Sequence, residues 1–81
     1  MLKSKEFYRI RYEGEDGQEY YRTWQGNWTP IDEGIHGEKE YATLRGARQA
    51  MNHFVGRTPG IVRGEVQRVV KLDTYGIEVL R

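Results

Sequence analysis

The carboxylates of this chain are candidates for general acid–base chemistry. They cluster around a predicted turn and in the loop that follows it: Glu13, Glu15, Asp16, Glu19, Asp32 and Glu33, with Glu38 and Glu40 further along. Paired carboxylates act as general acid and base only in a dry pocket that perturbs their pKa values. Carboxylates at turns are usually solvated, and a chain of 81 residues is small for enclosing such a pocket. We therefore expect no enzyme, and the carboxylates from Glu13 to Glu33 form an alternative, acidic contact face.

The chain lacks the residue spacings that mark metal, thiol and phosphate sites. Its two histidines, His36 and His53, have no partner at a metal-ligand spacing such as HExxH, and there is no cysteine to join them. Neither GxxxxGK[ST] nor GxGxxG occurs between a strand and a helix. We expect no metal site and no cofactor.

Arginines are the second group of residues that could form a functional site. Residues 1–40 carry a net charge of −3 and residues 41–71 a net charge of +5, although the whole chain has only +1. Such a small net charge argues against a dedicated, strongly basic nucleic-acid binder. Arginine outnumbers lysine by nine to four, and its planar guanidinium suits bidentate contact with carboxylate or phosphate. The candidate contacts are Arg45, Arg48, Asn52, Arg57, Arg63 and Arg68; the alternative is a solvated face that keeps the protein soluble.

The two tryptophans lie four positions apart in "RTWQGNWTP". Trp24 continues the alternation of Tyr20 and Arg22, which predicts a core or core-edge ring. Trp28 follows Gly26-Asn27 and lies outside any regular pattern. It is either a lid on an open end of the core or an exposed anchor, because Trp and Arg dominate binding hot spots.

The periodicity of the sequence predicts the strands and the helix that carry these residues. Residues 7–24 alternate as a hairpin, with a turn at Glu15–Gln18. A loop follows, with short strands predicted near Trp28–Ile31 and Glu40–Ala42. Residues 43–56 form the one clear helix: Thr43 caps its start, Gly56 is placed for a left-handed cap, and its apolar stripe is Leu44, Ala47, Ala50, Met51, Phe54 and Val55.

The C-terminal part predicts a type II turn at Pro59-Gly60 and a second hairpin. That hairpin turns at Asp73–Gly76. The order ββ(β)αββ predicts an α+β fold, with a single helix packed on an antiparallel sheet of four to five strands. We expect residues 1–81 to form a single small domain. No apolar run approaches the roughly 18 residues of a membrane span, and the N-terminus has no apolar stretch for a signal peptide.

The helix and final hairpin resemble small phage-encoded proteins, among them anti-CRISPR proteins that act on type I surveillance complexes. The similar residues are Thr43, Leu44, Ala47, Arg48, Ala50, Gly64, Val66, Arg68 and Val69. The resemblance implies a helix on an antiparallel sheet and a non-catalytic inhibitor that occupies a surface which normally binds nucleic acid or another subunit. It implies a host protein or ribonucleoprotein complex as partner. The absence of cysteine and of an apolar leader predicts the cytoplasm of the host cell as location, and a monomer and a homodimer are both open.

The N-terminal hairpin has a second resemblance, to the arm-type DNA-binding domain of tyrosine recombinases. There a three-stranded sheet enters the major groove, which implies that Arg9, Arg11 and Arg22 face DNA. The acidic turn at residues 13–19 and the near-zero net charge are unfavourable for phosphate contact. A small nucleic-acid-binding module is therefore the alternative function, and an accessory virion protein ranks third.

Overall fold

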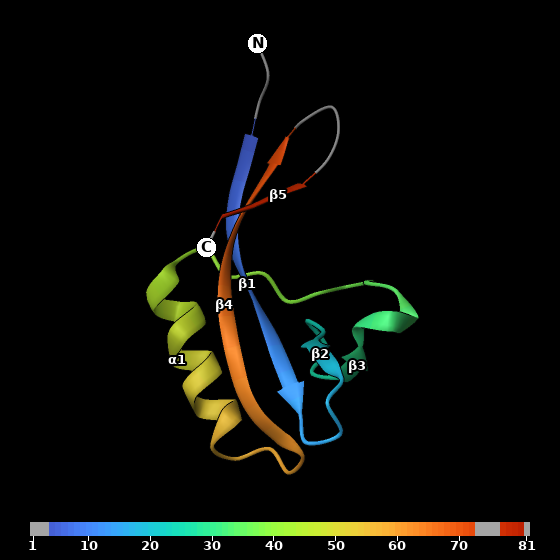
Figure 1. The fold of residues 1–81 in the computed structure, drawn as a ribbon. Coiled ribbons are helices and arrows are strands. Elements are labelled where there is room, and N and C mark those ends of the chain that lie inside the picture. The colour runs from blue at the N-terminus through green and yellow to red at the C-terminus, as the bar shows by residue number, and fades with distance from the viewer. Residues whose placement is uncertain (1–3, 73–76, 81) are drawn as a thin grey trace.

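The protein is an antiparallel sheet with a helix on one face (Figure 1). The computed structural model describes residues 4–72 and 77–80, with side chains for residues 5–70. Along the chain the elements are β1 (Ser4–Gly14), β2 (Glu19–Arg22), β3 (Trp28–Pro30), the 3-10 turn η1 (Ile31–Glu33), α1 (Leu44–Val55), β4 (Ile61–Leu72) and β5 (Ile77–Leu80). The strand order is β3-β2-β1-β4-β5, and all pairs are antiparallel. This confirms the predicted α+β fold.

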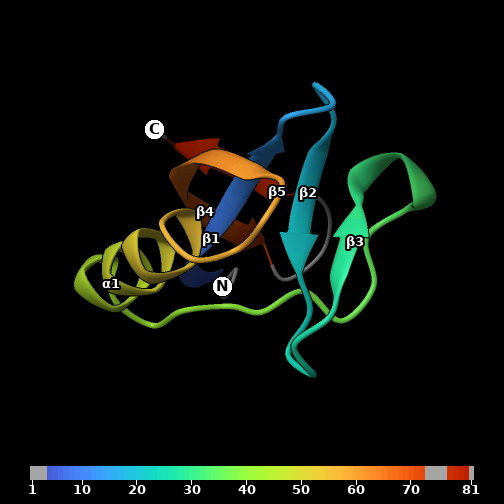
Figure 2. The same ribbon diagram turned by 90° about the horizontal axis from the view of Figure 1, so that it is seen from below.

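The two long strands, β1 and β4, pair with each other at the centre of the sheet. They pair from Ser4↔Leu72 to Glu13↔Arg63, and the register shifts between Glu13 and Gly14. Seen from below, α1 lies on the β4 side of β1, whereas β2 and β3 lie on the other side (Figure 2). The helix and the β2–β3 hairpin therefore flank opposite sides of one long ribbon.

Local sequence signals account for the turns and the start of the helix. Gly17 has a φ of 83°, and the carboxylate of Asp16 accepts a hydrogen bond from the Gln18 amide at 3.0 Å. The Thr43 hydroxyl accepts one from the Gly46 amide at 3.0 Å; a Cβ on residue 46 would lie 3.1 Å from that hydroxyl, so glycine fits the cap. The turn at Pro59-Gly60 is type II, since Gly60 has a φ of 87°.

The end of α1 differs from the prediction. Gly56 has a φ of −79° and continues in the right-handed region instead of the left-handed cap. Beyond Gly56, the Thr58 amide still donates a hydrogen bond to the carbonyl of Phe54. The left-handed glycine needed to reverse the chain is Gly60, four residues later.

The core lies between α1 and the sheet. Ile10, Tyr12 and Ala47 are buried there, and half-buried apolar side chains surround them, including Trp28, Met51 and Phe54. A Cβ on Gly64 would meet the Met51 side chain at 2.8 Å, so the missing side chain lets the helix approach β4. Leu44, predicted on the buried stripe, is 37% exposed because it lies in the first turn, at the rim of the interface.

The opposite face of the sheet has its own cover. Phe7, Tyr21 and Val69 are buried on it. The Tyr21 hydroxyl donates to the Gly34 carbonyl at 3.1 Å and accepts from the His36 amide at 2.9 Å. These bonds hold the segment after η1 against the sheet. The segment then pairs with β1 at the isolated bridge Tyr8↔Tyr41. A short strand was predicted at this place.

The prediction that Trp24 is a core ring is wrong, because its side chain is 68% exposed. Strand β2 ends at Arg22, and Trp24 follows in a tight turn closed by the bond from the Thr23 amide to the Asn27 carbonyl. Trp28 supplies the core ring instead. The predicted turn at residues 73–76 lies outside the described residues. In the described part of the chain, no helix has the length and apolarity that crossing a membrane requires.

Candidate partner-binding surface

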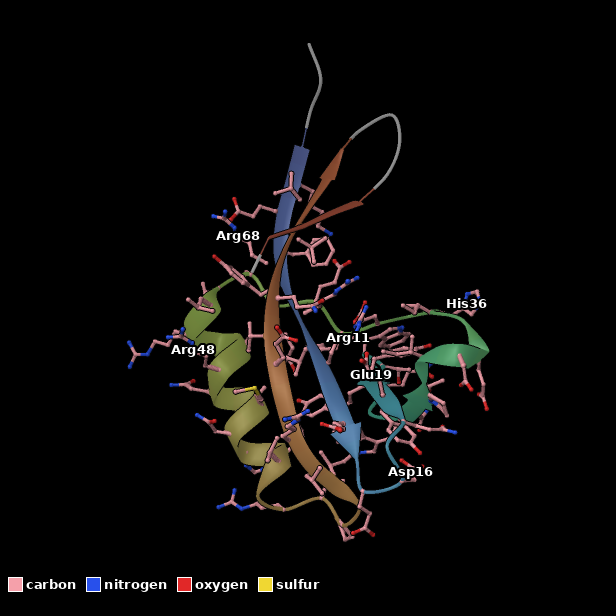
Figure 3. The ribbon with its side chains drawn as sticks, in the orientation of Figure 1. Arg11, Asp16, Glu19, His36, Arg48 and Arg68 are labelled. Atoms are coloured by element: carbon pink, nitrogen blue, oxygen red, sulfur yellow. The ribbon has the colours of Figure 1, made fainter. Side chains whose placement is uncertain are left out.

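The exposed side of α1 carries the first three candidate contacts. Arg45, Arg48 and Asn52 are all exposed, and α1 contains no acidic residue. No ion pair in the described part of the chain engages Arg45 or Arg48. Figure 3 shows Arg48 extending from α1 away from the sheet. Beyond the helix, the Arg57 guanidinium lies 2.6 Å from the His53 ring and extends the same basic surface.

The two arginines of β4 lie on opposite faces of the sheet. Arg68 is on the helix side, where its guanidinium is 3.5 Å from the Glu6 carboxylate, with both groups about half exposed. Arg63 is on the other side and pairs with Glu13. The structure therefore brings Arg68 close to the helix arginines and separates Arg63 from them.

A groove lies between α1 and β4. Its volume is about 400 Å³, and its walls are Tyr8, Leu44, Arg48, Met51, Gly64, Val66 and Arg68. The lining combines apolar side chains with one arginine from α1, Arg48, and one from β4, Arg68. Charge in the sequence predicts the two arginines as contacts, whereas helical periodicity predicts Leu44 and Met51 in the core. Only the packing of α1 against β4 turns these residues into the floor and wall of a groove.

Trp28 is half-buried and packs with ring-edge contacts on two sides. Its centroid lies 4.7 Å from that of Tyr12 and 5.8 Å from that of Phe54. This position corresponds to the lid alternative rather than to an exposed anchor. Among the described side chains, the large exposed ring is that of Trp24, which lies against Gly37 at the far end of the β2–β3 hairpin.

The acidic candidates do not gather on one face of the sheet. Glu13 and Glu19 are cross-strand neighbours beside an open hollow of about 360 Å³ that Arg11, Arg63 and Glu65 also line. Glu19 is exposed and Glu13 is paired with Arg63, so these carboxylates are not a dry pair. Glu15 and Asp16 are in the β1–β2 turn, whereas Asp32 and Glu33 are exposed in η1.

One contact in the acidic turn perturbs two titrations. The Tyr20 hydroxyl donates to the Asp16 carboxylate at 2.6 Å. This hydrogen bond, helped by the Gln18 amide, lowers the pKa of Asp16. The same hydrogen bond raises the pKa of Tyr20, because it is lost when the phenol ionises.

The resemblance to recombinases implies that Arg9, Arg11 and Arg22 face DNA together, but these arginines do not share a surface. Arg11 is 8% exposed and pairs with Glu38, whose side chain is 11% exposed, and Arg9 donates to Gln67 at 2.9 Å. Burial, reinforced by the charge of Arg11, lowers the pKa of Arg9. Arg22 lies on the opposite face, over the rings of Phe54 and Trp28. This pairing has no signal in the sequence, since Arg11 and Glu38 are 27 positions apart.

No cluster of three or more potential metal ligands occurs within residues 4–72 and 77–80. No family model, curated protein or solved structure matches the chain at a significant level.

Proposed function

We propose that this protein is a non-catalytic binding protein that inhibits its partner by occupying a functional surface. The observation that carries the proposal is the basic side of α1, where Arg45, Arg48 and Asn52 are exposed side by side and no internal ion pair uses the arginines. A rigid helix that presents guanidiniums without internal partners is suited to a carboxylate-bearing or phosphate-bearing surface.

The partner class follows from the sequence resemblance to small phage-encoded inhibitors. Thr43, Ala47 and Arg48, which contribute to that resemblance, belong to the start and middle of α1. A host protein or ribonucleoprotein complex is therefore the proposed partner. Arg57 and Arg68 would extend the contact from the helix face, while Arg63 would contact a partner only if it reached the other face of the sheet.

The test is capture of partners from a bacterial lysate with matched charge reversals. Wild type, the double variant Arg45→Glu/Arg48→Glu and the control Lys39→Glu are tagged, and each lysate is divided into untreated and nuclease-treated halves. Lys39 is exposed and belongs to the loop before α1, outside the helix. We expect one set of host proteins to bind wild type and Lys39→Glu, with or without nuclease, and to be lost from the double variant.

Two results would contradict the proposal. Equal capture by the double variant and wild type would show that the basic side of α1 is not the contact. Capture that disappears from all samples after nuclease treatment would show that nucleic acid is the primary ligand. Melting temperatures within a few degrees for all three proteins are the control for folding, because surface substitutions usually change stability by about 0.5 kcal/mol or less.

A further inference from the structure

Strand β4 has one outer edge that is only partly used. On that side β5 pairs with Arg68 to Lys71, whereas no strand of the described chain pairs with residues 62–67. An unpaired edge presents backbone donors and acceptors to any extended chain that reaches it. The free edge lies directly beside the groove between α1 and β4.

The register identifies which backbone groups the free edge offers. Tyr8 exchanges both hydrogen bonds with Tyr41, so its amide and carbonyl point away from β4. Successive residues of a strand point their backbone groups to alternate sides, so Arg9 and Arg11 point toward β4. Their partners are Gln67 and Glu65. It follows that the amides and carbonyls of Gly64 and Val66 point outward, to the free edge.

The side chains around this edge favour an apolar and acidic occupant. Gly64 and Val66 are also walls of the groove, together with Leu44 and Met51 of α1. Leu44 is 37% exposed and nearby Val62 is 53% exposed, so apolar surface is available along the edge. Arg48 and Arg68 flank the groove, and the contact from Arg68 to Glu6 is long and half exposed, which makes it exchangeable.

We infer that the groove between α1 and β4 binds an extended, acidic segment of a partner protein, which adds to the sheet as a strand along Gly64–Val66. Backbone hydrogen bonds would hold the segment, alternate apolar side chains would enter the groove, and its carboxylates would contact Arg48 and Arg68. This inference rests on the proposed function, and it specifies how the partner docks.

The charges argue against a second copy of this chain at the same edge. A second copy paired through Gly64–Val66 would bring no carboxylate from its α1 to Arg48 and Arg68, because that helix contains no acidic residue. An acidic strand would place carboxylates opposite both guanidiniums. The two occupants differ in one measurable property, because only a second copy makes the exchange of the edge amides depend on protein concentration.

The probe for the test is a displayed library of random linear peptides of about ten residues, long enough to exceed a typical strand. We expect selection on the wild-type protein to enrich peptides in which acidic and apolar residues alternate. An enriched peptide should slow hydrogen exchange at the Gly64 and Val66 amides. N-methylation of alternate peptide amides should weaken binding by about tenfold in one register and little in the other.

Arg48→Glu and Arg45→Glu are the matched variants. Both residues are exposed on α1, but only Arg48 lines the groove. Arg48→Glu should weaken peptide binding by about tenfold and Arg45→Glu by less than about twofold. Any of the following overturns the inference: no enriched peptide, equal effects of the two variants, tolerance of N-methylation in both registers, or edge amides that are protected by the protein's own dimerisation.

The same measurement separates this inference from the proposed function. If a partner captured from lysate needs Arg45 and Arg48 but leaves the exchange of Gly64 and Val66 unchanged, the binding function stands and strand addition is wrong. If library peptides pair with the edge but no host protein depends on the basic side of α1, the proposed function is wrong and the groove remains a strand-binding site.

Discussion

The guanidinium carbon of Arg22 lies 4.1 Å from the ring centroid of Phe54 and 5.5 Å from that of Trp28. Arg22 is the last residue of β2, and Phe54 is in the last turn of α1. A cation between these rings joins the β2–β3 hairpin to the helix and closes the open side of the core. A carbonyl at Gly26 accepts a hydrogen bond from the same guanidinium at 3.3 Å.

Replacing this cation should weaken the connection without emptying the space. Arg22→Met keeps an apolar stem over the rings but removes the charge, so we expect a loss of about 1 kcal/mol in the free energy of unfolding. Urea denaturation measures it. The control Arg45→Met removes a charge from the exposed side of α1 and should change stability by less than about 0.5 kcal/mol. Equal losses in the two variants would show that Arg22 does not stabilise the core.

Two buried tyrosines should respond oppositely to loss of the hydroxyl. Tyr12 and Tyr21 are each 1% exposed. The Tyr12 hydroxyl has no hydrogen-bond partner among the described residues, whereas the Tyr21 hydroxyl bonds to Gly34 and His36. Tyr12→Phe should therefore raise the free energy of unfolding by about 1 kcal/mol, and Tyr21→Phe should lower it by about 1 kcal/mol. A loss in both variants would mean that the Tyr12 hydroxyl has a partner in solution.

The pair Arg11–Glu38 should be sensitive to the loss of one member. Because Arg11 is buried and the Glu38 side chain is only 11% exposed, Glu38→Ala leaves a guanidinium charge without its partner and should cost about 3 kcal/mol of stability. The double variant Arg11→Met/Glu38→Leu removes both charges and should recover most of that loss. The exposed pair Lys5–Glu40 is the comparison, and Glu40→Ala should cost less than about 1 kcal/mol. Similar costs at Glu38 and Glu40 would contradict the burial of Arg11.

Acid should weaken the contact between Asp16 and Tyr20. Since the pKa of Asp16 is lowered from 3.8 in the folded state, its contribution to stability is present above that ordinary value and is lost as the pH falls through the folded pKa. Tyr20→Phe removes the hydroxyl that donates to Asp16. We expect carboxyl NMR titration to give a lower pKa for Asp16 in wild type than in Tyr20→Phe, and the stability difference between them to shrink on acidification. A constant difference between about pH 2 and pH 5 would exclude this coupling.

Local signals predicted the parts of the fold that depend on a few adjacent residues. The cap at Thr43, the turn at Asp16-Gly17 and the type II turn at Pro59-Gly60 each rest on one hydrogen bond or one glycine conformation. The tryptophans depend on where β2 ends. An alternation that continues to Trp24 predicts a core ring, but the turn at residues 23–27 takes Trp24 out of the strand and leaves Trp28 to fill the core.

The candidate surface was predictable only in part, for a similar reason. Helical periodicity is enough to predict that Arg45, Arg48 and Asn52 are exposed. The groove needs α1 and β4 together, and the burial of Arg11 needs Glu38 from a distant loop. Neither the docking angle of a helix nor the path of a long loop is encoded in the periodicity of a single segment.

Photo-crosslinking from two positions on opposite sides of the protein tests most directly whether α1 is the contact surface. A photoreactive amino acid replaces Asn52 on α1 in one sample and Glu33 in η1 in the other, and both are irradiated in bacterial lysate. Both positions are exposed, and Glu33 belongs to the alternative acidic face. We expect a covalent adduct with one host protein from position 52 that survives nuclease treatment, and none from position 33. An adduct from position 33 alone, or one that nuclease destroys, would contradict the proposed binding function.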